Sequence, residues 1–347
     1  MRKRPRQADV AALAKVSPAI VSRVINGQVD RDLRIGEDTR QRVWDAVREL
    51  GYVVNPIARK LAGHQNRLLG VFTYEPDFPI EHNFYYRFLI GIEREAQEQD
   101  YDLLLFTRAY SPDGRRTIYK DGVNSLQVAD GAVLLGANED REELTRFVQE
   151  EYPFVFVGRR EIAGGEISYA TADYSEATRK VVAFIYNKGH RRMVYLGTPT
   201  RNEAHEDREI GYRSAHQQLG LPFDERLIYR CPTTSITPEL LQSYLTGGAT
   251  AFIAENRAHA HALQEAAKQL GKHIPDDLSF AALGDPFDET EVIPDVTGFL
   301  TPCREMGREA VRLLIKKLQG DDPSLVYRTT LSCTFIEGRT VANPPTT

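Results

Sequence analysis

The stretch DVAALAKVSPAIVSRVIN, residues 9–26, decides how the start of the chain folds. Ser17 followed by Pro18 predicts a helix start, because a serine hydroxyl can cap free backbone N–H groups and a first-turn proline gives up a donor that had no partner. The helix that follows has one apolar face and one small, polar face. The apolar face holds Ile20, Val21, Val24 and Ile25, and the other holds Pro18, Ala19, Ser22, Arg23 and Asn26.

A second short helix is predicted just upstream. Val10, Leu13 and Ala14 form its apolar stripe, and the small side chains of Ala11 and Ala14 allow close helix approach. Two short helices joined by a tight turn, the second with an arginine on a small-residue face, indicate a helix-turn-helix that puts its second helix into the major groove of DNA. The alternative is an ordinary amphipathic helix pair, and this stretch alone leaves it open.

A third helix is predicted between Gly36 and Gly51, with acidic residues in its first turn and a glycine at its end. Its buried stripe is expected to be Val43, Trp44, Val47 and Leu50. The following segment NPIARKLAG, residues 55–63, has a helix cap, a first-turn proline and a glycine stop. About two turns of helix do not persist alone in water, so this segment is either a linker or a helix that forms only when docked.

The composition, 41% apolar and 27% charged over 347 residues, is typical of a soluble globular protein of two or three domains. No apolar run approaches the roughly 20 residues that span a bilayer, and the MRKRPR start is not a secretory signal. Cys231, Cys303 and Cys333 lie far apart without metal-ligand spacing. We therefore expect a cytoplasmic protein with reduced thiols and no membrane contact.

The net charge of −5 hides an asymmetry along the chain. Residues 1–63 carry 13 Lys and Arg against 7 Asp and Glu, which gives +6, and the remainder carries 31 against 42, which gives −11. A basic head on an acidic body fits a phosphate-binding module attached to a part that does not itself adhere to nucleic acid.

From residue 68 onward short apolar strands alternate with helical stretches, which predicts a doubly wound α/β arrangement with parallel sheets; about 280 residues suffice for two sheets. The predicted strands are Leu68–Tyr74, Asp102–Phe106, Gly131–Leu135, Phe154–Val157, Met193–Leu196, Ala251–Ala254 and Leu278–Ala282. The predicted helices include Tyr85–Gln99, Glu142–Glu150, Ser175–Lys188, Gly211–Leu219 and Ala258–Gly271. Ligands of such sheets bind at the carboxyl ends of the strands. No Gly-x-Gly-x-x-Gly or P-loop follows a strand, so no nucleotide cofactor is expected.

These pieces, in this order, resemble the LacI/GalR family of bacterial transcription regulators. The opening stretch and TRQRVWDAVRELGYVVNPIARKLAG, from Thr39, are similar to the family's headpiece and hinge almost position by position. Further on, KGHRRMVYLG (188–197), DREIGYRSA (207–215) and IPDDLSFAALGD (274–285) resemble its sugar-sensing core. The resemblance covers nearly the whole chain.

The resemblance implies an all-α helix-turn-helix headpiece plus a hinge helix, followed by an α/β two-lobed core like the periplasmic sugar-binding proteins. The expected boundaries are 1–54 for the headpiece, 55–66 for the hinge and 67–347 for the effector-binding and dimerisation core. We place the N-lobe at about 67–168 and 298–325 and the C-lobe at about 169–297 and 326–342. The three crossings are expected near 168–171, 295–300 and 324–327.

For DNA, Arg23 is the candidate base reader, because a guanidinium can bond two acceptors of guanine at once; its alternative is a phosphate contact or surface ion pair. The family's other reading positions fall on Pro18 and Ala19, which offer only apolar contact. Leu61 matches the family's wedge residue, which inserts at a minor-groove base step, or else packs on the partner hinge. The remaining DNA-facing residues are Ser17, Ser22, Asn26, Asn55 and Ala58.

For the effector, the resemblance places Phe84 and Tyr85 at paired cleft aromatics, Arg208 at the cleft arginine and Asn256 in an Asn-Asp pair. Tyr74, Arg159 and Asp285 complete the predicted set. Arg257 stands where the family has the Asp of that pair, and Gly284 takes the first position of a usual Asp pair. Since Arg159 and Arg208 add positive charge, we hypothesise an effector with an anionic group, such as a sugar acid or phosphate ester. His205 and Glu206 either line the cleft or are solvated.

These observations together predict a homodimeric, nucleoid-associated regulator, most simply a repressor of carbohydrate-utilisation genes, whose affinity for operator DNA is controlled by a small sugar-like effector. A sugar-binding receptor of a transport system is the first alternative, disfavoured because the basic headpiece would have no purpose and no export signal is present. An enzyme is the second, disfavoured because no Gly-x-Ser-x-Gly elbow and no paired catalytic spacing occurs.

Overall fold

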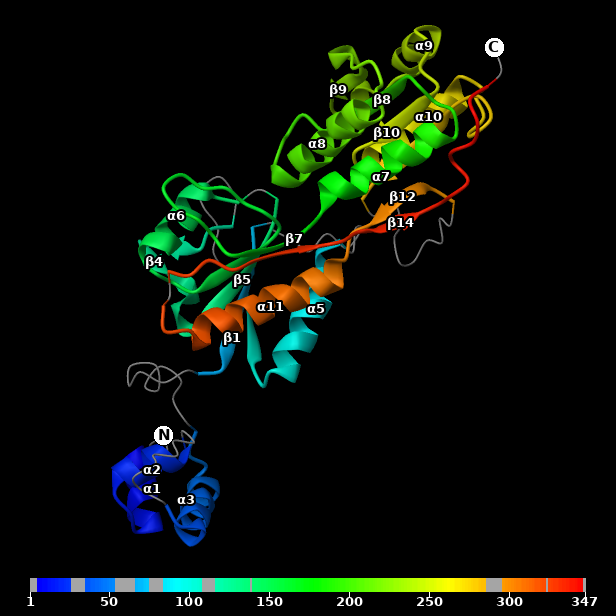
Figure 1. Cartoon of the computed structure of the whole chain (residues 1–347). Coiled ribbons are helices and arrows are strands. Elements are labelled where there is room, and N and C mark those ends of the chain that lie inside the picture. The colour runs from blue at the N-terminus through cyan, green and yellow to red at the C-terminus, as the bar shows by residue number, and fades with distance from the viewer. Residues whose placement is uncertain are drawn as a thin grey trace. The chain divides into compact units, whose positions relative to one another are not determined.

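The computed structural model describes residues 5–25, 35–53, 66–74, 84–107, 116–137, 139–284, 295–322 and 324–345. Its contacts divide the chain into two units, Met1–Arg67 and Leu68–Thr347 (Figure 1). The hinge predicted for 55–66 lies outside the described residues up to residue 65. In the described ranges no helix is long and apolar enough to cross a membrane. Five predicted site residues also lie outside them, namely Asn26, Asn55, Ala58, Leu61 and Asp285.

The first unit contains the predicted helix-turn-helix and the third helix. These are α1 (Gln7–Ala14), α2 (Pro18–Ile25) and α3 (Glu37–Leu50). The Ser17 hydroxyl accepts the Ile20 N–H at 3.3 Å, which confirms the predicted cap. The apolar face of α2 faces inward as predicted, because Val21 and Val24 are buried and Ile20 and Ile25 pack against the same cluster. The buried core of this unit is Val10, Ala11, Ala14, Val21, Val24, Val43 and Ala46.

Two side chains predicted to be buried in this unit are exposed. Leu13 is 41% exposed, because α1 turns Val10, Ala11 and Ala14 inward and position 13 falls to the side of that face. Trp44 is 40% exposed, because it follows the fully buried Val43 by one residue, which is a rotation of about 100° around the helix.

The second unit contains two six-stranded sheets among the residues described. The first sheet has the order β13-β7-β6-β5-β1-β2, and the second has the order β14-β12-β11-β10-β8-β9. Neighbouring strands are parallel, except that β14 pairs antiparallel with β12. The first sheet comprises β1 (Leu68–Thr73), β2 (Asp102–Phe106), β5 (Gly131–Leu135), β6 (Phe154–Val157), β7 (Tyr169–Ala172) and β13 (Arg328–Leu331). The second comprises β8 (Met193–Gly197), β9 (Ile228–Arg230), β10 (Ala251–Ala254), β11 (Ser279–Leu283), β12 (Thr297–Leu300) and β14 (Thr334–Ile336).

Helices cover the sheets, which confirms the predicted two-lobed α/β core. We call the lobe built on the first sheet the N-lobe and the other the C-lobe. The N-lobe helices are α5 (Phe84–Glu98), α6 (Arg141–Gln149) and α11 (Cys303–Gln319), and a small hairpin joins β3 (Tyr119–Lys120) to β4 (Val123–Asn124). The C-lobe helices are α7 (Tyr174–Asn187), α8 (Glu203–Gln218), α9 (Pro238–Thr246) and α10 (Arg257–Gln269). Helix α8 starts at Glu203, whereas a start at Gly211 was predicted. The prediction missed the first two turns, EAHEDRE, because they lack an apolar stripe.

The chain passes between the lobes three times, and each crossing lies a few residues later than predicted. It leaves the N-lobe sheet after β7, at Asp173, and returns after β12, at residues 301–302. The last crossing lies between β13 and β14, at residues 332–333. Each predicted position instead falls in or just before a strand that completes its sheet before the chain crosses, so the predicted lobe limits at 168, 298 and 326 are wrong by a few residues.

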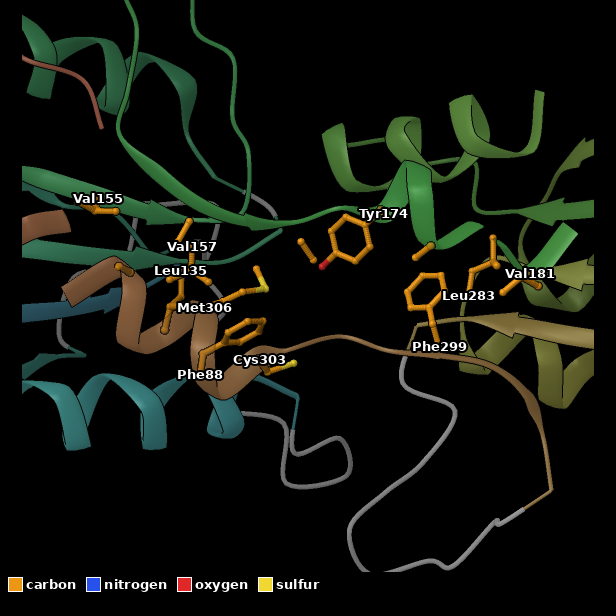
Figure 2. Close-up of a cluster of buried hydrophobic side chains, with 14 of the residues drawn as sticks. Phe88, Leu135, Val155, Val157, Tyr174, Val181, Leu283, Phe299, Cys303 and Met306 are labelled. Atoms are coloured by element: carbon orange, nitrogen blue, oxygen red, sulfur yellow. The ribbon is translucent and has the colours of Figure 1, made fainter. Parts of the chain in front are cut away.

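Alternation along the N-lobe strands builds two apolar layers. Leu69 and Val71 of β1 face one layer, and Phe72 and Tyr74 face the other. The first layer extends into the C-lobe, and Figure 2 shows Tyr174 and Phe299 in the same cluster as Cys303 and Met306. The rings of Tyr174 and Phe299 lie 6.3 Å apart, and these two residues stand next to the first two crossings.

Helices α5 and α11 pack against each other through glycine (Figure 1). A Cβ at Gly307 of α11 would lie 2.3 Å from the Phe88 carbonyl oxygen, and a Cβ at Gly91 of α5 would lie 2.0 Å from the Arg304 carbonyl oxygen. Because both obstacles are backbone atoms, neither can move without shifting a helix. This contact fixes α11, which begins directly after the second crossing, against the N-lobe.

We expect Gly307→Ala to destabilise the core by about 1–3 kcal/mol or more, because a methyl group there must push two helices apart. Thermal unfolding of the full chain measures the change. The matched control is Gly320→Ala at the end of the same helix, where a Cβ would lie 3.4 Å from the nearest atom. Equal unfolding temperatures for the two variants would contradict this account of the α5–α11 contact.

Candidate functional site

The outer side of α2 presents the residues that were predicted to face DNA. Ser17, Pro18 and Ala19 are exposed at the start of the helix, and Ser22 and Arg23 are half-buried. Small side chains at the exposed start of a short helix allow the backbone to approach another surface closely. The described part of the predicted interface is therefore one continuous helix face.

Two hydrogen bonds from other helices hold α2 and the turn before it in place. Gln7 Nε2 of α1 donates to the Pro18 carbonyl at 3.2 Å. Arg42 Nη1 of α3 donates to the Ala14 carbonyl at 2.9 Å, at the end of α1 where Lys15 adopts a left-handed backbone conformation. The tight turn of the motif is thus supported from both sides, and the role of Arg42 was not predicted.

The predicted effector residues of the N-lobe belong largely to its apolar layers. Tyr74 is buried with its ring edge-on to Phe72 at 5.0 Å, and burial together with the Glu143 carboxylate raises its pKa well above the usual range. Tyr85 is half-buried against the other layer and lies 6.4 Å from the ring of Phe88. Phe84 is the first residue of α5.

Two predicted effector residues of the C-lobe are already engaged in local structure. Asn256 caps α10, since its Oδ1 accepts the His259 N–H at 3.0 Å and lies 2.9 Å from His259 Nδ1. Arg208 is only 8% exposed; its guanidinium stacks on the Tyr174 ring at 4.0 Å, and its Nη1 donates to the Ala204 carbonyl at 2.8 Å. Its Nη2 lies 3.2 Å from where a Cβ of Gly284 would stand, and its buried Nε has no hydrogen-bond partner among the described residues.

Arg159, which was predicted to add positive charge to the effector site, joins the two lobes through an ion pair. Its Nη2 donates to Asp207 Oδ1 at 2.8 Å and its Nε to Asp207 Oδ2 at 3.3 Å, and its Nη1 bonds to Glu161. Arg159 follows β6 in the N-lobe, whereas Asp207 belongs to α8 in the C-lobe. Two carboxylates therefore neutralise this guanidinium.

A second set of charges lies beside this pair, around the Glu203 carboxylate of α8. Arg141 Nη1 lies 2.8 Å from Glu203 Oε1, and Arg160 Nη1 lies 3.8 Å from its Oε2. Arg141 and Arg160 also bind Glu139, at 3.3 and 2.9 Å, so the charges alternate in sign. We call these six residues the interlobe clasp: Glu139, Arg141, Arg159 and Arg160 of the N-lobe, and Glu203 and Asp207 of the C-lobe.

The clasp is strongly desolvated at its centre, because the Glu203 side chain is only 3% exposed. Burial alone would raise the pKa of Glu203, but the Arg141 guanidinium and the backbone N–H of Glu161, which donates at 2.8 Å, lower it overall. The carboxylate is therefore held in its charged form. Removing one partner from a buried ion pair costs roughly 3–5 kcal/mol, because the other charge is left uncompensated.

A further buried carboxylate, Glu255, follows β10 in the C-lobe. Tyr195 Oη donates to its Oε1 at 2.6 Å, Arg201 Nη1 donates to the same oxygen at 2.5 Å, and the Thr198 N–H donates to its Oε2 at 2.7 Å. These bonds satisfy Glu255 within its own lobe. Glu255, Arg201 and the clasp carboxylates are absent from the predicted site, although Glu255 and Glu139 each follow a strand end.

His205 shares the first turn of α8 with Glu203. Its Nδ1 accepts the Asn202 N–H at 3.3 Å, and Asn202 Oδ1 accepts the His205 N–H at 3.2 Å. Burial lowers its pKa to about 4; Glu255 opposes this shift, and the positive charges of Arg208 and Arg201 add to it. His205 is therefore neutral near pH 7 and acts as a cap at the start of α8.

Residues 8–55 match the lacI family of bacterial regulatory proteins, and residues 182–341 match the periplasmic binding protein-like domain. The chain is 27% identical to catabolite control protein A of Staphylococcus xylosus, over 90% of this chain and 92% of that protein. It is 28% identical to the HTH-type transcriptional regulator CelR of Thermobifida fusca, over 92% of this chain and 94% of that protein.

Two solved structures share the fold over almost the whole chain. One is the complex of the transcriptional regulator CelR with cellobiose, with a TM-score of 0.65 and 24% identity, covering 97% of this chain and 100% of that one. The other is the lac repressor dimer bound to operator and the anti-inducer ONPF, with a TM-score of 0.71 and 20% identity, covering 98% of this chain and 100% of that one.

The state of His205 makes the stability of the core depend on pH. Its folded pKa lies below the ordinary 6.5, so its contribution is present above pH 6.5 and is lost as the pH falls towards 4, by at most about 3 kcal/mol. Urea unfolding of the full chain at pH 7.5 and pH 5 measures this loss. We expect His205→Asn to reduce the difference between the two pH values, and the exposed-site control His273→Asn to leave it unchanged. If His205→Asn shows the same difference in unfolding free energy between pH 7.5 and pH 5 as the wild type, the role of neutral His205 as a cap is contradicted.

Proposed function

The chain belongs to the LacI/GalR family of bacterial regulatory proteins, and from that premise we propose that it binds operator DNA as a homodimer and regulates transcription in response to a small sugar-like effector. The observation that carries the DNA-binding part is the exposed outer face of α2 on a compact helical unit. The charge difference between residues 1–63 and the rest of the chain supports the same assignment, because phosphate contacts supply most non-specific affinity for DNA.

In this proposal the outer face of α2 enters the major groove. Arg23 reads a guanine, Pro18 and Ala19 make apolar contacts such as one to a thymine methyl group, and Ser17 and Ser22 contact phosphates. Asn26, Asn55, Ala58 and Leu61 are proposed to make the remaining DNA contacts. The chain then divides into a headpiece at 1–54, a hinge at 55–66 and a core from 67.

The homodimer is supported by the open edge of the N-lobe sheet. Strand β2 lies at that edge among the described strands, and its Leu105 is 49% exposed. Tyr86 of the neighbouring α5 is 52% exposed. An unpaired strand edge beside exposed apolar side chains is typical of a surface that another chain covers. A two-fold dimer would present two headpieces to two half-sites of a palindromic operator.

The effector is proposed to bind between the lobes, at the carboxyl ends of their strands. The solved CelR complex contains cellobiose, which supports a carbohydrate ligand for this chain. The regulated genes are then those of carbohydrate use, the protein acts as a repressor in the cytoplasm at the nucleoid, and it carries out no catalysis.

Arg208 is the residue that we assign to an anionic group of the effector, together with Tyr85, Asn256 and Asp285 as further contacts. Arg159, Arg160 and Arg141 are bound to carboxylates of the clasp, whereas no described carboxylate bonds to Arg208. A buried guanidinium is costly unless an anion pairs with it. The anionic effector expected from the sequence therefore rests on one arginine.

Selection of duplexes from a random pool tests DNA binding, with affinity measured by fluorescence anisotropy. We expect a palindromic sequence to be enriched and Arg23→Ala to weaken binding to it about 5- to 150-fold, since a bidentate guanine contact is worth about 1–3 kcal/mol. Arg48→Ala removes an exposed charge from α3 and should weaken binding less than about threefold. No enriched sequence, or equal losses in both variants, would remove the proposed role.

Thermal unfolding with matched sugars tests the effector class. We expect galacturonate or glucose 6-phosphate to raise the unfolding temperature where galactose or glucose does not, and Arg208→Met to abolish the effect. Without added sugar, the Arg208→Met variant should be at least as stable as the wild type, because the apolar methionine side chain still packs on the Tyr174 ring. Arg160→Met should be less stable. Stabilisation by a neutral sugar equal to that by its acid would refute an anionic effector.

A further inference from the structure

Apart from the crossings, two kinds of contact connect the lobes among the residues that the structure describes. One is the apolar cluster that contains Tyr174 and Phe299 (Figure 2), and the other is the interlobe clasp. Tyr174 directly follows the crossing at Asp173, and Phe299 lies two residues before the crossing at Thr301. Contacts so close to the crossings change little when one lobe rotates about them, as residues at a hinge do.

The clasp differs from that cluster because charge-assisted hydrogen bonds need a donor–acceptor distance near 2.7–2.9 Å. The hydrogen bond from Arg159 Nη2 to Asp207 Oδ1 has this length, at 2.8 Å, and the N···O distance of the ion pair between Arg141 and Glu203 is also 2.8 Å. The C-lobe supplies only Glu203 and Asp207, which lie one helical turn apart on α8 and so share a face. A rotation that moves this turn by a few ångströms breaks both bonds together.

The backbone also takes part in the clasp. The Glu161 N–H of the N-lobe donates to Glu203 Oε1 of the C-lobe at 2.8 Å. Exchange of this amide hydrogen with solvent therefore reports directly whether the lobes are in contact.

We propose that Glu203 and Asp207 are positioning residues that hold the lobes together through the clasp, so that this chain's own ion pairs set the angle between the lobes and, through it, the affinity for operator DNA. The first part rests on the contacts alone, and the link to DNA rests on the proposed function. The effector then acts on an equilibrium that the clasp already biases, and it can shift that equilibrium only by its differential affinity for the two arrangements.

Charge reversal in the full-length protein tests the proposal. The variants are Arg159→Asp, Asp207→Arg and the double variant, which restores an opposite-charge pair. These side chains are 22% and 19% exposed, so folding should survive, and Asp207→Asn is a milder second variant. The control is Glu166→Arg, which reverses an exposed carboxylate that pairs with Arg328 inside the N-lobe. The readouts are exchange of the Glu161 amide, resolved by mass spectrometry, and affinity for the selected duplex.

Each single reversal should speed exchange of the Glu161 amide about tenfold or more, as expected from loss of a charge-assisted pair, and should change operator affinity in the same direction. The double variant should return both quantities to within about threefold of wild type, and Glu166→Arg should alter neither. Wild-type exchange in both single variants, or no recovery in the double variant, overturns the clasp. A third outcome is that amide exchange changes in the single variants and recovers in the double variant, while neither the wild type nor any variant binds DNA sequence-specifically. That outcome supports the clasp and contradicts the proposed function.

Discussion

The Glu203 carboxylate is charged, almost fully buried and shared between the two lobes, and this combination constrains the rest of the core. Such a group is tolerated only where donors and positive charges surround it. The Glu161 N–H donates to its Oε1 at 2.8 Å, and the Arg141 and Arg160 guanidinium nitrogens lie 2.8 and 3.8 Å from its two oxygens. All three come from the N-lobe, while Glu203 itself belongs to α8 of the C-lobe. This arrangement of the lobes places the Glu203 charge beside two guanidinium groups, while its Oε2 has no hydrogen-bond partner among the described residues, and separating the lobes must hydrate the carboxylate.

The same constraint explains which side chains are available to a ligand. The clasp uses the arginines that follow β6 and the acids that begin α8, so these groups bind each other across the lobes. Arg208 remains next to Tyr174, at the first crossing, with its Nε unpaired among the described residues. An anion at Arg208 would thus bind on the same stretch of α8 that carries the clasp carboxylates Glu203 and Asp207, so both interactions act on the same helix.

Much of the fold could be predicted because strands buried on both faces read as apolar runs. Gly131–Leu135 and Phe154–Val157 form strands with the predicted bounds. Strands β7 and β13 escaped prediction because their sequences, YATA and RTTL, are only four residues long and contain no run of large aliphatic side chains, and β13 lies at a sheet edge. These two omissions displaced the predicted crossings at 168 and 326.

The candidate site was less predictable, for a physical reason. Periodicity identifies a buried face but not the partner of a charge, and Arg159 and Asp207 stand 48 positions apart in different lobes. The exposure of the outer face of α2 could be predicted because helical periodicity is a local property of the sequence. Trp44 was wrongly placed on the buried face of α3, one residue from the buried Val43.

The central claim, that the clasp and DNA affinity are coupled, is tested most directly by the reciprocal measurement. Exchange of the Glu161 amide is measured in wild-type protein with the selected operator duplex and with a scrambled duplex. Because coupling between two sites is mutual, the operator must change the exchange rate relative to the scrambled duplex. Equal rates with both duplexes, at saturating operator, would contradict the claim.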